Sequence, residues 1–269
     1  MALKKFPAPH KFTKLSLKIR GPIPVIQLVS RAKSVEELKV LLKGVSGRDR
    51  RRIKEKTKNQ SECPNWHLYR QAIITGTLVK RICSFVQKPK NSPTSLNKAI
   101  SKFGQGKFTN EALQWGITNE EKGIKVLWDY FKKNHKEPKL HKIGLCLDKE
   151  LAFLGGSPDC VLTCENCCCE GKKVYIGEVK CPFRLRYSGI SAWTTLEYLT
   201  ENCELKKNHT YYYQQNLYAG INEASLTYFV IWTPYGHLII PIQFDPELYA
   251  LIRKSAEKYY FEHYVKEFF

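Results

Sequence analysis

Two segments of β-type sequence flank the short polar stretch CENCCCEG, and this pair constrains the fold more than any other feature of the chain. The segments run from about 156 to 163 and from about 173 to 181. A short polar connection that contains a glycine is typical of a β-hairpin. A symmetric hairpin that turns between residues 168 and 169 places Asp159 opposite Glu178 across the two strands.

Glu178 and Lys180 lie two residues apart in the second segment, so their side chains point to the same face of the strand. Two charges on one face of an apolar strand need an explanation, because burying an ion pair is costly. Asp159 adds a second carboxylate, and adjacent carboxylates repel each other unless a divalent cation lies between them. The pattern predicts a Mg²⁺ site that would bind phosphate and lower the pKa of a bound water. A surface ion pair at a strand end is the alternative reading of the bare pattern.

The rest of the chain predicts helices and further strands around this hairpin. We expect helices over 34–42, 66–83 (broken at 75–77), 111–133, 191–204, 209–219 and 246–268, and strands over 226–232 and 237–244. Residues 1–30 and 88–106 are expected to be irregular. Glu120 lies four residues before Ile124 and therefore sits on the buried edge of the 111–133 helix. Strands mixed with helices on one core indicate an α/β or α+β domain.

The positive charge of the chain is concentrated at its N-terminal end. The formal net charge is +19, and residues 1–60 hold 17 Lys and Arg against 4 Asp and Glu. Such an imbalance points to a polyanionic partner, with nucleic acid as the first candidate. A basic tail that only aids solubility or nuclear import is the alternative. We expect a basic N-terminal arm with a short helix over 1–58 and a main domain over 59–269.

Four of the ten cysteines crowd into the predicted turn, namely Cys164, Cys167, Cys168 and Cys169. Cys164-x-x-Cys167 has the spacing of a structural Zn²⁺ site, and free thiols explain the cluster equally well. Cys164 would lie roughly 16 Å from Asp159 along an extended strand, at about 3.3 Å per residue. The cluster would therefore take no part in catalysis.

Several sequence motifs occur in an order that closely resembles the YqaJ-type viral recombinase family, which includes the lambda exonuclease, within the PD-(D/E)XK nuclease superfamily. The resemblance covers roughly residues 58–268. The motifs are Gln60 with Trp66-His67-Leu68-Tyr69-Arg70 and Thr75-Gly76-Thr77, then Trp115-Gly116-Ile117-Thr118-Asn119-Glu120, Gly155-Gly156-Ser157-Pro158-Asp159, Gly177-Glu178-Val179-Lys180-Cys181-Pro182-Phe183 and Tyr211-Tyr212-Tyr213-Gln214.

The resemblance implies an α/β fold of the PD-(D/E)XK (restriction endonuclease-like) type, a mixed β-sheet flanked by helices. It also implies roles for individual residues. Asp159, Glu178 and the backbone carbonyl of Val179 would hold the metal, and Glu120 would contribute to a second metal. Lys180 and Gln214 would assist the attacking water. A 5′-phosphate of DNA would be bound by Arg70, Thr75, Thr77 and Ser157, whose guanidinium and hydroxyl groups suit phosphate.

The resemblance further implies a metal-dependent deoxyribonuclease that digests duplex DNA from a 5′ end, with Mg²⁺ or alternatively Mn²⁺ as cofactor. Some family members act as homotrimers. This chain departs from the family pattern at Cys160, where Gly is common, so the backbone there is expected to differ. The family's Gln-x-Gln is Gln214-Gln215 here, and Gln214 is the preferred catalytic candidate. Its Thr-Ala-Ser becomes Thr75-Gly76-Thr77, which keeps both hydroxyls.

Two other readings remain at this point. A catalytically silent DNA-binding or recombination scaffold would keep the fold, although intact acidic residues argue against it. An RNA-cleaving relative would share the phosphate chemistry. No apolar run approaches the ~20 residues of a membrane helix, and no secretory signal is evident. We therefore expect a soluble intracellular protein without a membrane partner, and the sequence does not distinguish nucleus from cytoplasm.

Overall fold

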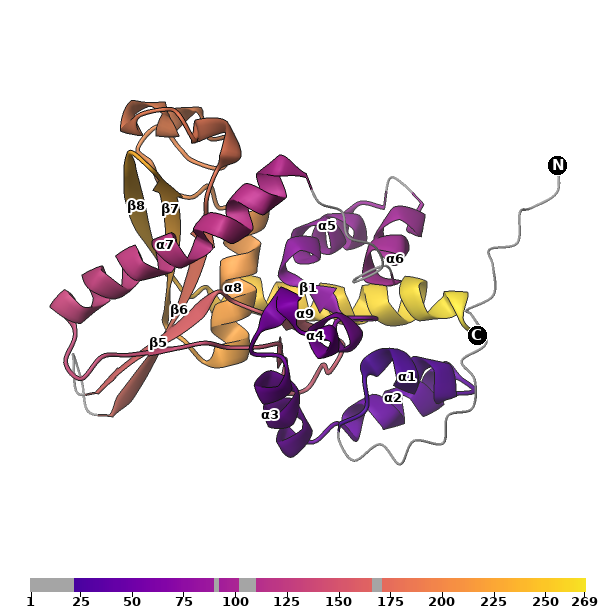
Figure 1. The fold of residues 1–269 in the computed structure, drawn as a ribbon. Coiled ribbons are helices and arrows are strands. Elements are labelled where there is room, and N and C mark those ends of the chain that lie inside the picture. Colours follow the sequence, from indigo (N-terminus) through magenta and orange to yellow (C-terminus); the bar gives the residue numbers. More distant parts are fainter. Residues whose placement is uncertain (1–21, 90–91, 102–109, 166–170) are drawn as a thin grey trace.

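The computed structural model describes residues 22–89, 92–101, 110–165 and 171–269 (Figure 1). The α-helices are α1 Val25–Arg31, α2 Val35–Lys43, α3 Gly47–Lys56, α4 Pro64–Tyr69, α5 Gly76–Gln87, α6 Thr94–Ser101, α7 Glu111–Asn134, α8 Thr210–Asn222 and α9 Pro246–Tyr259. The strands are β1 Ile74–Thr75, β2 Lys139–His141, β3 Cys146–Leu147, β4 Leu154–Gly156, β5 Cys160–Glu165, β6 Lys172–Lys180, β7 Leu226–Thr233 and β8 Gly236–Gln243.

A five-stranded mixed sheet carries the predicted hairpin at its centre. Its strand order is β2-β5-β6-β7-β8, with β6 and β7 parallel and the other neighbours antiparallel. A second, three-stranded sheet has the order β1-β4-β3. Because β4 ends only a few residues before β5 begins, the chain passes from the small sheet to the large one next to Asp159.

Helices cover both faces of the large sheet (Figure 1). Helix α7 packs on one face, where Leu127 and Phe131 are buried against Leu162 and Val230. The opposite face is covered by α8 and by the segment 183–205, whose Trp193 is buried against Phe229 and other apolar side chains of the sheet. The expected mixed sheet flanked by helices is therefore confirmed.

Local sequence signals explain where most helices begin. Ser34 caps α2 by accepting the Glu37 N–H, and Asp245 caps α9 by accepting the Leu248 N–H. Asn110 caps α7 in the same way. The helices expected from residues 34, 111, 209 and 246 and the strands expected from residues 226 and 237 are present. After Tyr259 the last helix continues as a π-helical and then a 3₁₀ turn.

Three expectations about secondary structure are wrong. Residues 25–31, expected to be irregular, form α1, because Val25, Leu28 and Val29 reach the main core. Residues 94–101, also expected to be irregular, form α6, whose Leu96 and Ile100 are buried. The helix expected over 191–204 is a 3₁₀ helix, Ile190–Thr195, followed by turns. The strands β1 to β3 are short and were not anticipated.

The N-terminal helices pack against the rest of the described chain. Leu38 of α2 and Ile53 of α3 belong to the same apolar cluster as Ile74 and Tyr260. The division of the chain at residues 58 and 59 stays a prediction. Among the described residues, no helix is both long and apolar enough to cross a membrane.

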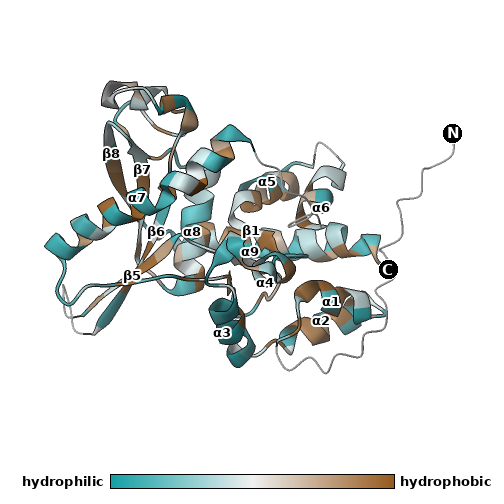
Figure 2. Ribbon diagram, viewed as in Figure 1, coloured by the Kyte–Doolittle hydropathy of each residue, from teal (hydrophilic) through white to brown (hydrophobic). Residues whose placement is uncertain are grey.

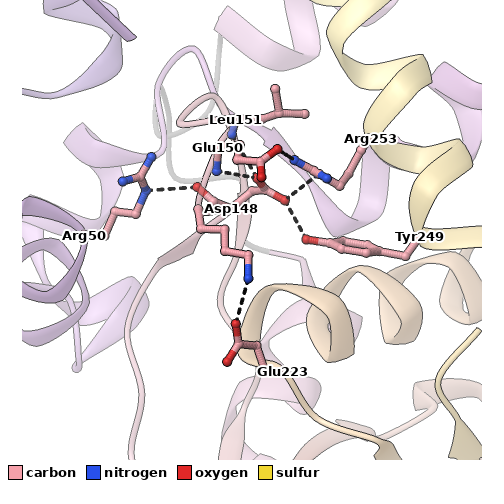
Figure 3. Close-up of polar contacts among 8 residues, drawn as sticks. Arg50, Asp148, Glu150, Leu151, Glu223, Tyr249 and Arg253 are labelled. Atoms are coloured by element: carbon pink, nitrogen blue, oxygen red, sulfur yellow. Dashed lines mark hydrogen bonds and ion pairs between the residues drawn. The ribbon is translucent and has the colours of Figure 1, made fainter. Parts of the chain in front are cut away.

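Buried Asp148 joins three segments that are distant in sequence (Figure 3). Its carboxylate accepts the backbone N–H groups of Glu150 and Leu151 and the Tyr249 hydroxyl of α9, at 2.8, 2.9 and 2.5 Å. Arg253 Nε lies 3.2 Å from the same carboxylate. The Asp148 carbonyl accepts Arg50 Nε of α3 at 3.0 Å. This network ties α3 and α9 to the loop between β3 and β4.

Candidate active site

The hairpin register brings Asp159 and Glu178 together as the sequence predicts. Strands β5 and β6 pair Cys160 with Gly177, and the same register continued by one residue sets Asp159 opposite Glu178. The Val179 backbone N–H donates to Asp159 Oδ2 at 2.6 Å. Cys160, a departure from the family pattern, pairs regularly with Gly177, where the absence of a side chain leaves room for its Sγ, since a Cβ on Gly177 would lie only 2.5 Å from it. The backbone difference from the family expected at Cys160 stays a prediction.

Lys180 and Glu178 form an ion pair on one face of β6. Lys180 Nζ lies 2.6 Å from Glu178 Oε1, and the Glu178 side chain is only 4% exposed. Gln214 of α8 donates from Nε2 to the same oxygen at 2.8 Å and to the Tyr218 hydroxyl at 2.9 Å. Gln214 therefore contacts the predicted acidic centre directly.

Burial and the neighbouring carboxylates raise the proton affinity of Asp159 and Glu120. Burial and the neighbouring charges of Glu178 and Glu120 raise the pKa of Asp159 well above its usual range. Burial and the Glu178 charge also raise the pKa of Glu120. Burial alone would lower the pKa of Lys180, but the charges of Glu178 and Asp159 raise it above its ordinary value. Lys180 is therefore a fixed cation at neutral pH.

The donor set fits a hard divalent cation. Three carboxylates within electrostatic reach of one another are the ligands that Mg²⁺ and Mn²⁺ prefer. Glu178 Oε2 is buried and has no hydrogen-bond partner among the described residues, so one carboxylate oxygen is available to a ligand. In the described part of the chain, no three His, Cys, Asp or Glu side chains are close enough together to hold a metal ion as they stand. The other Glu178 oxygen is engaged by Lys180 and Gln214.

A cleft of about 610 Å³ opens beside the carboxylates, and Glu120 and Asp159 line it. Its walls come from α7, from β2 and from residues 58–62, which follow α3. Gln60 fixes one wall by donating from Nε2 to the Pro158 carbonyl at 2.9 Å and to the Ile143 carbonyl at 3.2 Å. The acidic cluster is therefore reachable from this cleft.

The predicted phosphate-binding residues gather on the other side of Glu178. Arg70 Nη1 donates to Ser157 Oγ at 3.4 Å, and Trp66 Nε1 donates to the same oxygen at 2.9 Å. The Arg70 guanidinium lies 4.1 Å from the centre of the Trp66 ring. Arg70, Ser157 and Thr75 are buried, at 7%, 6% and 1% exposure. Burial lowers the pKa of Arg70 to about 10, although the nearby Tyr218 and Glu178 oppose this shift.

Thr75 and Thr77 flank the start of α5, and their hydroxyl oxygens are 3.4 Å apart. Gly76 between them allows α5 to approach α8, because a Cβ there would lie 2.8 Å from Gln214 Cγ. Thr75 and Thr77 thus lie at the start of a helix that packs against α8, and Ser157 follows β4, which also contacts α8.

Tyr218 is the residue that sequence reasoning missed. Its hydroxyl accepts from Gln214, and a Cβ on Gly156 would lie 2.1 Å from its ring. Tyr218 follows Gln214 by four residues, so the two share one face of α8. This spacing is the signal that could have identified it. The ring connects the acidic cluster to the phosphate-binding side.

The cysteine cluster is only partly within the described chain. Cys164 lies in β5 and is buried in the core beneath α7, with Leu127 and Phe131 in the same apolar cluster. Cys167, Cys168 and Cys169 lie outside the described residues. Binding of Zn²⁺ by the cysteine cluster stays a prediction, with free thiols as the alternative.

A mixed sheet flanked by helices, with Asp159 directly before one strand and Glu-x-Lys on the next, defines a nuclease of the PD-(D/E)XK class. Residues 32–231 match the model of the viral alkaline exonuclease family. The chain therefore belongs to this family of nucleases, which agrees with the lambda-exonuclease resemblance of its motifs.

Solved structures share the fold at low sequence identity. An alkaline exonuclease from Laribacter hongkongensis has a TM-score of 0.55 at 17% identity, over 76% of this chain and 93% of that chain. The Shutoff and Exonuclease Protein of Kaposi's sarcoma-associated herpesvirus has a TM-score of 0.53 at 11% identity, over 91% and 79% of the two chains. No curated protein matches this chain in sequence.

Proposed function

We propose that this nuclease is a Mg²⁺-dependent exonuclease that degrades duplex DNA from a 5′ end. The observation that carries this proposal is that the candidate phosphate ligands are buried on segments that pack against the Gln214–Tyr218 pair, which in turn contacts Glu178. Because Arg70, Thr75 and Ser157 are almost fully buried, they suit the terminal phosphate of a strand better than a backbone that runs on in both directions. Recognition of a terminal phosphate would make cutting depend on a strand end.

In this proposal Asp159, Glu178, Glu120 and the Val179 carbonyl hold the divalent cation, with Mn²⁺ as an alternative to Mg²⁺. When bound, the cation would lower the pKa of a water and offset charge on the phosphate. Positioning by the protein supplies the remaining catalysis.

Lys180 and Gln214 complete the proposed site. The Lys180 ammonium stays protonated and would stabilise negative charge on the scissile phosphate. Gln214 holds the Glu178 carboxylate in place through Nε2 and orients the attacking water through its amide. Gln214 Oε1 is buried without a partner among the described residues, and it is therefore available to accept a hydrogen bond from a water.

Substrate and assembly belong to the same proposal. A SOX–DNA complex has a TM-score of 0.55 to this chain at 12% identity, and a KSHV SOX–RNA complex has 0.52 at 11%. The DNA complex supports DNA as the substrate, and the RNA complex makes RNA the second candidate substrate. We also propose residues 59–269 as the nuclease domain, and a homotrimer as the assembly.

The proposal is tested with linear duplex DNA that carries a 5′-phosphate, alongside closed circular duplex DNA and RNA of the same sequence. Each is incubated with Mg²⁺, with Mn²⁺ or with chelator. We expect metal-dependent loss of the linear DNA alone, from the 5′ end. An Asp159→Ala variant should lose this activity, whereas Asp129→Ala, which removes an exposed acid of α7, should keep it.

Other outcomes have definite meanings. Cutting of the circle would make the protein an endonuclease. Faster loss of RNA than of DNA would replace the substrate assignment. Binding of DNA without metal-dependent loss of any substrate, by wild type and Asp159→Ala alike, would leave a silent DNA-binding scaffold.

A further inference from the structure

Helix α3 is anchored to the protein by one face only. Ile53 is buried in the main core. Thr57 Oγ1 accepts the Leu145 N–H at 2.8 Å and donates to the Ile53 carbonyl at 2.7 Å. A Cβ on Gly144 would lie 2.2 Å from Thr57 Oγ1, so the packing there is tight. These contacts fix which side of α3 faces outward.

The outward side of α3 is strongly basic. Arg51 and Lys54 are three residues apart, so they lie along one side of α3. Lys58 follows two residues after the end of the helix at Lys56. Arg51 and Lys58 are exposed, and Lys54 is half-buried. Glu55 lies on the same outward side, and it pairs with Lys58 at 2.5 Å. Figure 2 shows α3 as hydrophilic along its length. We call Arg51, Lys54 and Lys58 the α3 stripe.

The α3 stripe ends at the active-site cleft. Lys58 lines that cleft together with Gln60 and Asp159. The N-terminal half of α3 borders a second pocket of about 650 Å³, which Arg50 lines with Lys43 and Lys254. Arg50 is held in place by its hydrogen bond to the Asp148 carbonyl (Figure 3). The stripe therefore runs between a basic pocket and the predicted site of cutting.

Lysines from three elements act together on the wall of the cleft. His141 of β2 lines the cleft, and burial together with Lys172, Lys139, Lys58 and Lys54 lowers its pKa. The lysines that act on His141 therefore come from β2, β6 and the C-terminal end of α3. Such a group of cations attracts a polyanion.

We propose that the α3 stripe binds the sugar-phosphate backbone of duplex DNA and leads it into the active-site cleft. The inference rests on the proposed nuclease function, since it takes the cleft as the place of cutting. The helix extends about 7–8 Å from Arg51 to its end at Lys56, and Lys58 lies two residues beyond that end. Duplex DNA carries one negative charge per about 1.7 Å. Three cations over this length suit a continuous backbone better than a mononucleotide. The contacts would be independent of base sequence.

The test measures duplex-DNA binding in chelator, so that no cutting occurs, over a range of salt concentrations. The variant Arg51→Ala/Lys54→Ala/Lys58→Ala is compared with Lys133→Ala/Lys258→Ala/Lys266→Ala, which removes three exposed lysines elsewhere. Each lost phosphate contact lowers the slope of log K against log salt by about one. We expect a fall of about three for the stripe variant and no change for the control. Equal slopes in the two variants would overturn the inference.

A single substitution keeps the inference testable if the triple variant folds poorly. Glu55→Gln removes the acid beside Lys58, so DNA binding should tighten severalfold at low salt; unchanged binding would contradict the stripe. Stripe-dependent binding that is tighter for RNA than for DNA would overturn the DNA assignment. Cutting of DNA by wild type in Mg²⁺, measured separately, decides the proposed function. If wild type cuts DNA in Mg²⁺ but the stripe variant binds DNA as wild type does, only the inference about the α3 stripe is overturned.

Discussion

At the scale of single residues, the adjacent glutamines Gln214 and Gln215 of α8 have different environments. Gln214 Nε2 contacts Glu178 and the Tyr218 hydroxyl. Gln215 is fully buried, and neither of its side-chain polar atoms has a hydrogen-bond partner among the described residues. The difference follows from helix geometry, because neighbouring residues point about 100° apart. This agrees with the sequence-based preference for Gln214 as the catalytic candidate.

We expect Gln214→Ala to lower the rate of DNA degradation about 100-fold, because Glu178 loses a donor that fixes its position. The Gln215→Met variant should degrade DNA within about twofold of the wild-type rate. Its free energy of unfolding should not fall, because the substitution removes an unsatisfied buried amide. Single-turnover degradation rates and thermal melting curves of both variants check this. Equal loss of activity in the two variants at equal stability would contradict the assignment.

At the scale of elements, the site depends on close approach between β4, α5, α7, α8 and β6. Gly156 of β4 leaves room for the Tyr218 ring, and Gly123 of α7 leaves room for Val179, since a Cβ there would lie 2.3 Å from Val179 Cγ1. The missing side chains allow α7 and α8 to hold β6 between them. The glycines thereby determine how near Glu120 and Gln214 come to the carboxylates of the hairpin.

Gly156→Ala should destabilise the protein by about 1–3 kcal/mol, because the added methyl group meets the buried Tyr218 ring at 2.1 Å. Gly116→Ala in α7 is the matched control, since nothing lies within 4 Å of its Cβ position. That change should stabilise by about 0.5–1 kcal/mol through helix propensity. Denaturant unfolding midpoints of the two variants give the comparison. If Gly156→Ala left the free energy of unfolding unchanged, α8 would be able to shift without loss of stability.

At the scale of the whole molecule, the Asp148 network connects the N-terminal helices to the C-terminal one. The carboxylate is almost fully buried and is shared between Tyr249 and Arg253 of α9, while the carbonyl binds Arg50 of α3 (Figure 3). Removal of the carboxylate leaves Tyr249 and two backbone N–H groups without an acceptor.

Asp148→Ala is therefore expected to lower the free energy of unfolding by about 2–3 kcal/mol. Lys149→Ala breaks only the exposed ion pair with Glu223, and it should change stability little. Chemical denaturation at constant pH measures both. If the two neighbouring substitutions had equal effects, the Asp148 carboxylate would not hold α9 to the loop between β3 and β4.

The sequence alone determined the parts of this protein that rest on local rules. The alternation of side chains along β6 placed Glu178 and Lys180 on one face. The symmetric hairpin set the register that brings Asp159 to Glu178. Capping residues and apolar periodicity predicted α2, α7, α8 and α9. Each of these follows from residues close in sequence, so no knowledge of the rest of the fold was needed.

The tertiary structure decided what depends on contacts between distant segments. Residues 25–31 and 94–101 are helical because the main core receives their apolar side chains, which no local pattern announced. Tyr218 reaches Gly156 only because α8 packs on β4. The basic run of α3 was visible in the sequence, but its position beside the cleft was not. Burial and proximity across the fold are properties of packing, and packing is a property of the whole chain.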